Sequence, residues 1–370
     1  MKRIASILSV AIAYTCQFAA AAPPLQASGA FDTTVTSPDD AIAHPSDGCA
    51  GAVVLTPRQG TQFAHTASPH SASARSFYEI AADTNVEWLS EMVCGIDDMP
   101  HAMTKSSQEG IESTPGLFTT YYTYNWSGYE LDHTALYMQG LYTEPSVSAP
   151  YPGYAPAGYG YASSIWAGMG GGEAALTSIL MQSGTTQLTM ANTSVCPGSS
   201  VTHFFWYEIY RGPAGMSGAR PICNMPLYPG DQVGAFTAWV ATTGQTQFGL
   251  CNYTRSQCLN FTVSGSTTPP GATAEWIVEA PTVTGIIQPL ARFGNVSFHD
   301  LCWASTYTPG GAITCGAFTS PQTLILHSNV LGGVQILAEP GVMSSNGNFV
   351  DYYRQPVDET CGHPGHPACP

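Results

Sequence analysis

Charged residues are scarce in this chain of 370 residues, and lysine is almost absent. Only 9% of the residues are charged, and 25 acidic against 10 basic residues give a formal net charge of −15. The chain has no basic stripe of the kind that binds nucleic acid. Because few of its side chains are charged, acid adds little repulsion between its charges. It also has few ion pairs to lose when its carboxylates become protonated. The composition fits an acidic exported protein, or one that works in acid, and excludes nucleic acid as an expected partner.

The signatures of the common hydrolases are also missing. The sequence has no Asp-Thr-Gly or Asp-Ser-Gly pair for an aspartic dyad, no His-Glu-x-x-His zinc helix and no Gly-x-Ser-x-Gly elbow. Its histidines are scattered, and the ten cysteines beyond Cys16 can all pair, which leaves no thiol as an obvious nucleophile. We therefore expect no metal, no cofactor and no conventional nucleophile.

The N-terminus has the three parts of a secretory leader. Lys2 and Arg3 form the charged start, residues 4–14 form an apolar core, and residues 19–22 are small enough for cleavage. The apolar core is too short to span a bilayer, and no later stretch is long enough. We expect residues 1–21 to be a signal peptide and the remaining chain to be secreted, with no membrane partner.

Ten cysteines remain beyond this leader, and an even number in an exported chain indicates disulfides. Their spacing suggests the pairs Cys49–Cys94, Cys196–Cys223, Cys251–Cys258, Cys302–Cys315 and Cys361–Cys369. The last pair lies in a tail, residues 357–370, whose Cys and His residues also resemble a metal-binding arrangement. An oxidising compartment favours the disulfide there.

The character of the sequence changes near residue 118. Residues 22–118 contain twelve acidic residues, loops rich in His and Ser, and an apolar periodicity over residues 76–93 that predicts a helix. Over residues 119–356, short strands alternate with turns rich in Gly, Pro and Asn, which is typical of an antiparallel sandwich. We expect an all-β domain there, preceded by a smaller region with some helix that is either a pro-segment or an accessory domain.

Three predicted strands place polar side chains where an ordinary sandwich strand would have apolar ones. Residues two apart on a strand share a face, so Glu275 shares a face with Glu279, and Glu208 shares one with aromatic residues. Gln182 lies beside apolar neighbours on a third strand. A neutral amide that faces a carboxylate can hydrolyse a peptide in acid. Gln182 and Glu279 are therefore the candidate catalytic pair.

Five short segments match a known pattern in order and at similar intervals, over about residues 119–355. They are Asn125-Trp126-Ser127-Gly128, Ile165-Trp166-Ala167-Gly168, Met181-Gln182-Ser183-Gly184, Trp206-Tyr207-Glu208 and Ala274-Glu275-Trp276-Ile277-Val278-Glu279. In this the chain resembles the glutamic peptidases, family G1, also called eqolisins. Each segment alone is a weak signal, whereas five in order are a strong one.

The resemblance implies a curved antiparallel double-sheet sandwich, a concanavalin A-like or lectin-like jelly roll, with a substrate cleft on its concave face. It implies an acid endopeptidase that acts on polypeptides through Gln182 and Glu279, with a removable N-terminal pro-segment. We expect residues 22–118 to be that segment and to inhibit the enzyme, with Lys105 or Arg75 facing the cleft carboxylates. We also expect a monomer. The expected cleft residues are Trp126, Trp166, Trp206, Glu208 and Glu275.

Two segments depart from the family pattern. Fungal members have Ile-Asp-Gly after the second tryptophan, where this chain has Met169-Gly170-Gly171, so one cleft carboxylate is missing. An acidic residue expected soon after the catalytic glutamine is replaced by Thr185 and Thr186. The dyad itself is retained.

Two other functions fit parts of the same pattern. A carbohydrate-binding sandwich would use exposed Trp and Tyr with Asn and Gln for stacking on sugars. A glycosidase would use Glu275 and Glu279, but residues four apart on a strand lie roughly 13 Å apart. That exceeds the separation of an inverting carboxylate pair.

Overall fold

The computed structural model describes residues 49, 51–55, 65–66, 75–95, 108–111, 119–150, 160–171, 179–211, 218–264, 270, 272–283, 286–311, 313–330 and 333–354. The expected signal peptide, Lys105 and the Cys361–Cys369 tail lie outside them. Within the described residues, no helix has the length and apolar character needed to cross a bilayer.

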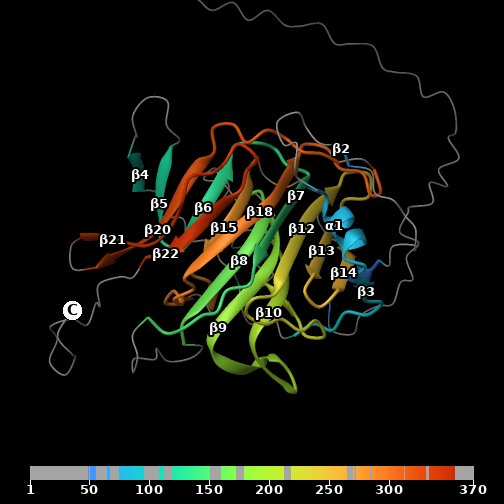
Figure 1. Ribbon diagram of the computed structural model, residues 1–370, viewed down its shortest axis with the longest axis horizontal. Coiled ribbons are helices and arrows are strands. Elements are labelled where there is room, and N and C mark those ends of the chain that lie inside the picture. Colours follow the sequence, from blue (N-terminus) through green and yellow to red (C-terminus); the bar gives the residue numbers. More distant parts are fainter. Residues whose placement is uncertain are drawn as a thin grey trace, which may run out of the picture. The chain divides into compact units, whose positions relative to one another are not determined.

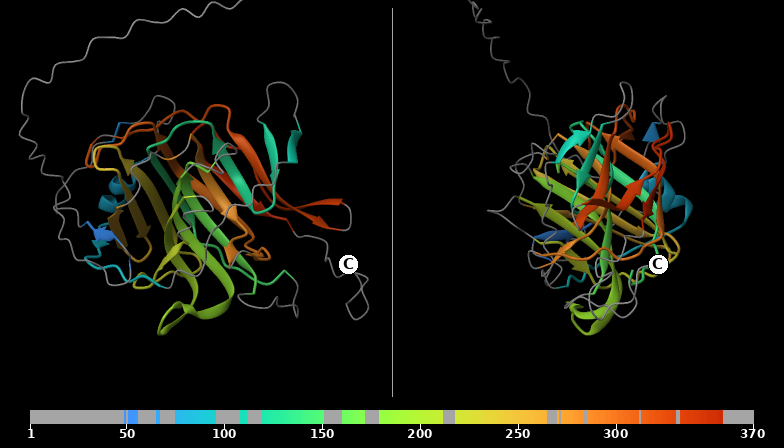
Figure 2. Two further views of the ribbon diagram at one scale, coloured as in Figure 1. Left: turned by 180° about the vertical axis from the view of Figure 1, so that it is seen from behind. Right: turned by 90° about the vertical axis from the view of Figure 1, so that its left-hand side faces the viewer.

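The strands form one large hydrogen-bonded sheet that folds over into two layers (Figures 1 and 2). The first layer has the order β11 (Arg220–Ile222), β10 (Ser199–Tyr210), β9 (Leu180–Cys196), β8 (Ala162–Met169), β15 (Ala274–Glu279), β6 (Trp126–Leu131) and β20 (Gln322–Val330). Beside β20 lie β5 (Thr120–Thr123) and β4 (Gln108–Ile111). All these pairs are antiparallel except β20 with β5.

The second layer begins where β21 (Gly333–Pro340) passes from β20 to β22 (Phe349–Tyr353). From there the order is β18 (Asn295–Ala304), β7 (Tyr137–Thr143), β12 (Gln232–Val240), β13 (Gln245–Asn252) and β14 (Gln257–Val263), with β1 (Ala52–Val54) and β3 (Glu87–Trp88) beside β14. Two small sheets pair β16 (Thr282–Val283) with β17 (Ile286–Ile287), and β2 (His65–Thr66) with β19 (Ile313–Thr314). The prediction of an antiparallel all-β double sheet is confirmed.

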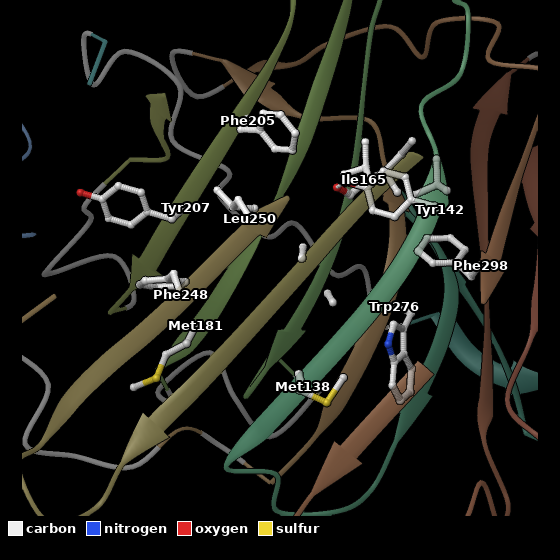
Figure 3. Close-up of a cluster of buried hydrophobic side chains, with 14 of the residues drawn as sticks. Met138, Tyr142, Ile165, Met181, Phe205, Tyr207, Phe248, Leu250, Trp276 and Phe298 are labelled. Atoms are coloured by element: carbon white, nitrogen blue, oxygen red, sulfur yellow. Dashed lines mark hydrogen bonds between the residues drawn. The ribbon is translucent and has the colours of Figure 1, made fainter. Parts of the chain in front are cut away.

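The main hydrophobic core lies between the two layers (Figure 3). The first layer contributes Ile165, Met181, Phe205, Tyr207 and Trp276, and the second contributes Met138, Tyr142, Phe248, Leu250 and Phe298. These residues are interleaved along their strands with residues that face the other way, as period-two alternation requires. The inward set occupies one face of β8, β9, β10 and β15, so the opposite face of these strands carries the polar residues singled out above.

Helix α1 (Phe77–Asp83) packs on the second layer, where Phe77 meets Phe236. Ser76 caps it, and Glu79 completes a capping box. The expected helix over residues 76–93 is correct at its start and wrong beyond residue 83. Asn85 adopts a left-handed backbone (φ 49°) that ends the helix, and the chain then runs extended into β3, which pairs with β14.

Four of the five expected disulfides are present: Cys49–Cys94, Cys196–Cys223, Cys251–Cys258 and Cys302–Cys315. The first joins two segments of the N-terminal region to each other. The others join neighbouring strands or loops of the two-layer sheet. The spacing argument is confirmed for these four pairs.

Candidate active site

The candidate residues lie on the face of the first layer that points away from the core. Cross-strand register places them in three rows over β15, β8, β9 and β10. The rows, each read across the four strands, are Glu279–Ser164–Thr186–Phe204, Ile277–Trp166–Gly184–Trp206 and Glu275–Gly168–Gln182–Glu208. On the other side of β15, β6 adds Trp126, Gly128 and Glu130. We call this surface the site face.

Two glycines make room for the large side chains of the site face. A Cβ on Gly184 would lie 2.0 Å from the Ile165 carbonyl oxygen and 2.7 Å from the Trp166 Cβ. A Cβ on Gly168 would lie 3.0 Å from the Gln182 Cβ and 3.0 Å from the Trp166 ring. Because neither glycine has a side chain, Trp166 and Gln182 can lie across the neighbouring strand. The glycines in the Trp-Ala-Gly and Gln-Ser-Gly segments are therefore required by packing.

Glu279 is held by two neutral N–H donors. The Trp166 Nε1–H donates to Glu279 Oε2 at 2.8 Å, and the Asn125 side chain donates through Nδ2 to Oε1 at 3.2 Å. The Trp126 ring packs edge to face on Trp166, with centroids 4.8 Å apart. Both carboxylate oxygens are thus oriented by groups that do not titrate.

Gln182 is oriented by a carboxylate. Its Nε2 donates to Glu208 Oε2 at 2.7 Å, directly across the β9–β10 pair. An ionised carboxylate only accepts, so with Glu208 ionised the amide nitrogen faces Glu208 and the amide oxygen turns away. This fixes which end of the amide is presented to a reacting group.

Three buried polar atoms on or beside the site face have no hydrogen-bond partner in the described part of the chain. They are Asn125 Oδ1, Trp126 Nε1 and Gln182 Oε1. Buried polar groups are nearly always paired, so unpaired ones require a physical explanation. Asn125 donates to Glu279, and Trp126 packs on Trp166, the tryptophan that also donates to Glu279. Gln182 is the second member of the expected dyad. The set offers both a donor and acceptors to a polar ligand.

Glu275 lies in the same row as Gln182, with Gly168 between them. Its Oε1 accepts from the Gly171 backbone N–H at 2.9 Å. Gly170 has φ 100°, and a Cβ on Gly171 would lie 2.8 Å from the Trp126 ring. The Met169-Gly170-Gly171 departure therefore gives a close turn whose backbone binds a carboxylate.

Glu130 is a site-face residue that the sequence did not predict. It lies directly opposite Glu275 on β6 and is 1% exposed. Opposed residues on antiparallel strands have Cβ atoms about 5 Å apart, so two carboxyl groups meet here. Its position four residues after Trp126, on the same face of one strand, was the available signal. The site face therefore has a carboxyl group from β6, although Gly170 stands where fungal members of the family have Asp.

Comparison with known proteins identifies the family. The model of the peptidase A4 family matches residues 124–326, more than half of the chain. The chain belongs to this family, the glutamic peptidases or eqolisins. It is a glutamic-type peptidase, a hydrolase of peptide bonds.

Solved structures add two likenesses at low identity. One is SCP-B, a member of the eqolisin family in complex with the tripeptide Ala-Ile-His, with 17% identity and a TM-score of 0.43; the match covers 62% of this chain and 98% of SCP-B. The other is basic winged bean lectin with Tn-antigen, with 11% identity and a TM-score of 0.23, covering 42% of this chain and 67% of the lectin. No curated protein sequence matches the chain.

All seven predicted site residues of this glutamic peptidase lie on the site face: Gln182, Glu279, Trp126, Trp166, Trp206, Glu208 and Glu275. Arg75 does not reach them. Its guanidinium pairs with Asp83 at 3.0 Å in a half-exposed position, and its backbone N–H donates to Asp300. The expectation that Arg75 faces the cleft carboxylates is wrong, because the turn before α1 directs it to the helix's own last residue.

The site face of this glutamic peptidase is covered. Gln182 and Glu279 are each 1% exposed, and Trp126, Trp166 and Trp206 are no more than 2% exposed. The resemblance implied a cleft open to substrate. In this chain, indole rings lie against Glu279 and against each other instead. The side chains of the expected dyad are therefore buried in this structure.

Proposed function

We propose that this glutamic peptidase is a secreted acid endopeptidase in which Gln182 and Glu279 activate a water molecule together. Glu279 takes a proton from the water, and the resulting hydroxide attacks the scissile carbonyl carbon. Gln182 donates an amide N–H to the developing oxyanion. Protonated Glu279 then gives its proton to the leaving nitrogen, so the peptide bond breaks without a covalent intermediate.

The observation that supports this assignment is that both head groups lie on one face and each is held by its own hydrogen-bond partners. Trp166 and Asn125 hold the Glu279 carboxylate, and Glu208 holds the amide nitrogen of Gln182. The Gln182 Oε1 is buried without a partner among the described residues, as an acceptor for the hydrogen of a bound water would be. The second N–H of the same amide is left for an oxyanion.

An amide donor suits catalysis in acid because it does not titrate. A carboxylate base must be ionised to act, whereas the glutamine N–H is available at any pH. Preorganised donors of this kind typically contribute about 10²–10³ in rate. The proposed pair therefore divides the work between one group that changes its protonation and one that does not.

The experiment compares Glu279→Gln and Gln182→Ala with the unmodified protein in casein cleavage at pH 3–4. We expect each variant to lose at least about 10²-fold in activity while its circular dichroism and thermal unfolding match those of the parent. A matched control is Gln247→Ala, which alters a buried glutamine of the second layer. Full activity in either dyad variant would refute the assignment.

We also propose that residues 1–21 direct secretion, that residues 22–118 form a pro-segment, and that the mature domain is 119–356. The boundary falls between β4 and β5, which pair at the edge of the first layer. The Cys49–Cys94 bridge lies wholly within the pro-segment, so no disulfide among the described residues crosses the boundary. Cleavage near residue 118 would break the covalent link between β4 and the layer that carries the dyad, leaving only the β4–β5 pairing.

The buried helix α1 makes a specific prediction about this maturation. Because Phe77 packs in the second layer and β1 pairs with β14, the cut N-terminal piece should stay bound until acid or a second cut removes it. Acidifying purified Glu279→Gln precursor separates the outcomes. Processing of that inactive protein in the absence of other peptidases would exclude self-cleavage.

A further inference from the structure

Asn125 is a buried residue beside Glu279, and only one end of its side-chain amide is used within the chain. Its Nδ2 donates to Glu279 Oε1 at 3.2 Å, and an ionised Glu279 requires the nitrogen rather than the oxygen to face it. The residue is 1% exposed, and its Oδ1 has no hydrogen-bond partner among the described residues. A buried acceptor without a partner costs free energy. An acceptor thus stands available on the same amide that holds the proposed base.

The backbone fixes Asn125 at this place. The Ala280 N–H donates to the Asn125 carbonyl at 2.8 Å, so Asn125 lies opposite the residue that follows Glu279. The Thr123 hydroxyl closes the turn before β6, because it accepts from the Trp126 N–H at 2.8 Å and donates to the Trp126 carbonyl. The amide of Asn125 is therefore held against Glu279 by the pairing of β6 with β15 and by the turn that precedes it.

A second buried asparagine shows how a structural amide of this kind is paired. Asn252 is 0% exposed, and its Nδ2 donates to Asp231 Oδ2 at 2.7 Å. Its Oδ1 accepts from the Arg255 backbone N–H at 3.2 Å. Asn125 makes the same kind of bond to a carboxylate, but the described chain supplies no donor to its oxygen. The difference indicates that the Asn125 oxygen serves a group from outside the chain.

The scissile peptide bond brings a suitable group to Glu279. In the proposed mechanism Glu279 gives a proton to the leaving nitrogen, and that nitrogen already carries one hydrogen. Asn125 is in hydrogen-bond contact with Glu279, so a nitrogen placed for proton transfer from Glu279 is also near Asn125 Oδ1. Because both head groups are held before substrate binds, they can orient the nitrogen without a further cost in entropy.

We propose that Asn125 Oδ1 accepts the N–H of the scissile peptide bond while Asn125 Nδ2 holds Glu279. This inference rests on the proposed function, because it takes Glu279 as the proton donor to the leaving nitrogen. Hydroxide adds to the carbonyl carbon, the C–N bond breaks, and the nitrogen becomes pyramidal. Its original hydrogen stays on Asn125, and its lone pair turns towards Glu279 and takes the proton that came from water. The new amine then leaves with both hydrogens.

The test compares a peptide with a matched depsipeptide at pH 3–4, in which an ester oxygen replaces the scissile N–H. Asn125→Ala removes a donor to Glu279, which affects both substrates, and removes the acceptor for the N–H, which affects the peptide alone. We therefore expect kcat/KM to fall about tenfold more for the peptide than for the ester, as the loss of one hydrogen bond predicts.

Trp166→Phe is the matched control, because it removes the other neutral donor to Glu279, at 2.8 Å, and leaves Asn125 in place. Its peptide-to-ester ratio measures what a poorly oriented Glu279 does by itself. Asn125→Asp keeps an acceptor oxygen and should change the ratio no more than Trp166→Phe does. Asn252→Ala removes a buried asparagine outside the site and should leave the ratio unchanged.

The proposal fails if Asn125→Ala lowers the peptide-to-ester ratio no further than Trp166→Phe. Asn125 would then act on Glu279 alone, and the proposed function would stand. If Asn125→Ala does not fold, Asn125→Ser is measured in the same way, since its shorter side chain cannot bridge Glu279 and the substrate. Absence of cleavage of both substrates by the unmodified protein would instead refute the proposed function.

Discussion

The two faces of the first layer bury carboxylates in different ways. On the inner face, Glu144 accepts from Thr185, Gln187 and His203, all within 2.9 Å. On the site face, Glu279 has two neutral donors, and its expected partner Gln182 has a buried oxygen without one in the described chain. Saturated networks make a core rigid and specific, whereas unsaturated ones are costly unless they serve binding or chemistry. The comparison predicts that changes on the inner side affect stability and changes on the site face affect activity.

Asp351 extends the comparison to a third carboxyl group, which is buried with few donors. It lies on β22 and is fully buried, and the Ser127 hydroxyl lies 2.9 Å from each of its oxygens. Desolvation by burial raises the pKa of Asp351 from 3.8 to about 8, against the lowering effect of the Ser127 hydrogen bond. Burial also raises the pKa of Glu144, and the hydrogen bond from His203 opposes that rise. Both shifts favour the folded chain in acid.

The largest effect is expected for Asp351→Asn. Because the folded-state pKa is raised, the native chain keeps a proton that the unfolded chain releases above pH 3.8. The resulting stabilisation is complete below pH 3.8 and is lost as the pH rises towards 8. Each pH unit in this window lowers the free energy of unfolding of the parent by up to about 1.4 kcal/mol. Between pH 4 and pH 7, the free energy of unfolding of Asp351→Asn should therefore rise by about 4 kcal/mol relative to that of the parent. Urea unfolding at several pH values measures this.

The control for Asp351→Asn is Asp83→Asn, which removes an exposed carboxylate paired with Arg75. Its effect on stability should change little with pH, since exposed pairs contribute little. If the difference in stability between the parent and Asp351→Asn is the same at pH 4 and pH 7, Asp351 ionises normally. The inner side would then not favour acid through this residue.

A smaller loss is expected for Glu144→Ala, about 3 kcal/mol in the free energy of unfolding at pH 5. The substitution leaves the buried donors of Gln187, Thr185 and His203 without their acceptor, and breaking a buried pair by removing one partner is strongly destabilising. Glu144→Gln keeps an acceptor in place and should lose clearly less. If the two variants are equally stable, neither the cavity nor the retained neutral acceptor matters, and loss of the carboxylate itself explains the cost.

Much of this fold followed from local pattern. Alternation along β10 and β15 gave the correct faces for Trp206, Glu208 and Glu279, because side-chain period in a strand is fixed by backbone geometry. The predicted helix over residues 76–93 was too long, because the spacing of apolar residues reveals neither the left-handed backbone of Asn85 nor the pairing of Glu87–Trp88 with β14. The boundaries of strands depend on their partners, which lie far away in the sequence.

The site was predictable in its residues and not in its contacts. The strand pattern and the resemblance both pointed to Gln182 and Glu279, whereas Glu130 came only from the register that places it opposite Glu275. The covered state of the face also escaped prediction, because it depends on how Trp126 and Trp166 pack together. Likewise, nothing in the sequence joins Glu144 to His203, which are 59 residues apart.

On the site face, Trp166→Phe should reduce kcat/KM about 30-fold and change stability by less than about 1 kcal/mol. The ring is kept, but the Nε1–H that donates to Glu279 at 2.8 Å is lost, and a hydrogen bond to a charged group contributes about 1.5–3 kcal/mol. Trp303→Phe is the matched control, since its Nε1–H donates to the Ala317 carbonyl outside the site. Equal activity in the two variants would mean that Trp166 does not orient the base.

The smallest effect is expected for Glu208→Gln, about fivefold in kcat with little change in KM. A carboxylate at 208 admits one orientation of the Gln182 amide, because it only accepts. A glutamine there can also donate, so the Gln182 amide can turn over and present the wrong end to the reacting groups. A neutral acceptor also holds the amide less strongly, by about 1 kcal/mol. Glu208→Ala removes all orientation and should lose more activity than Glu208→Gln, whereas the reverse order would mean that Glu208 acts on the substrate directly.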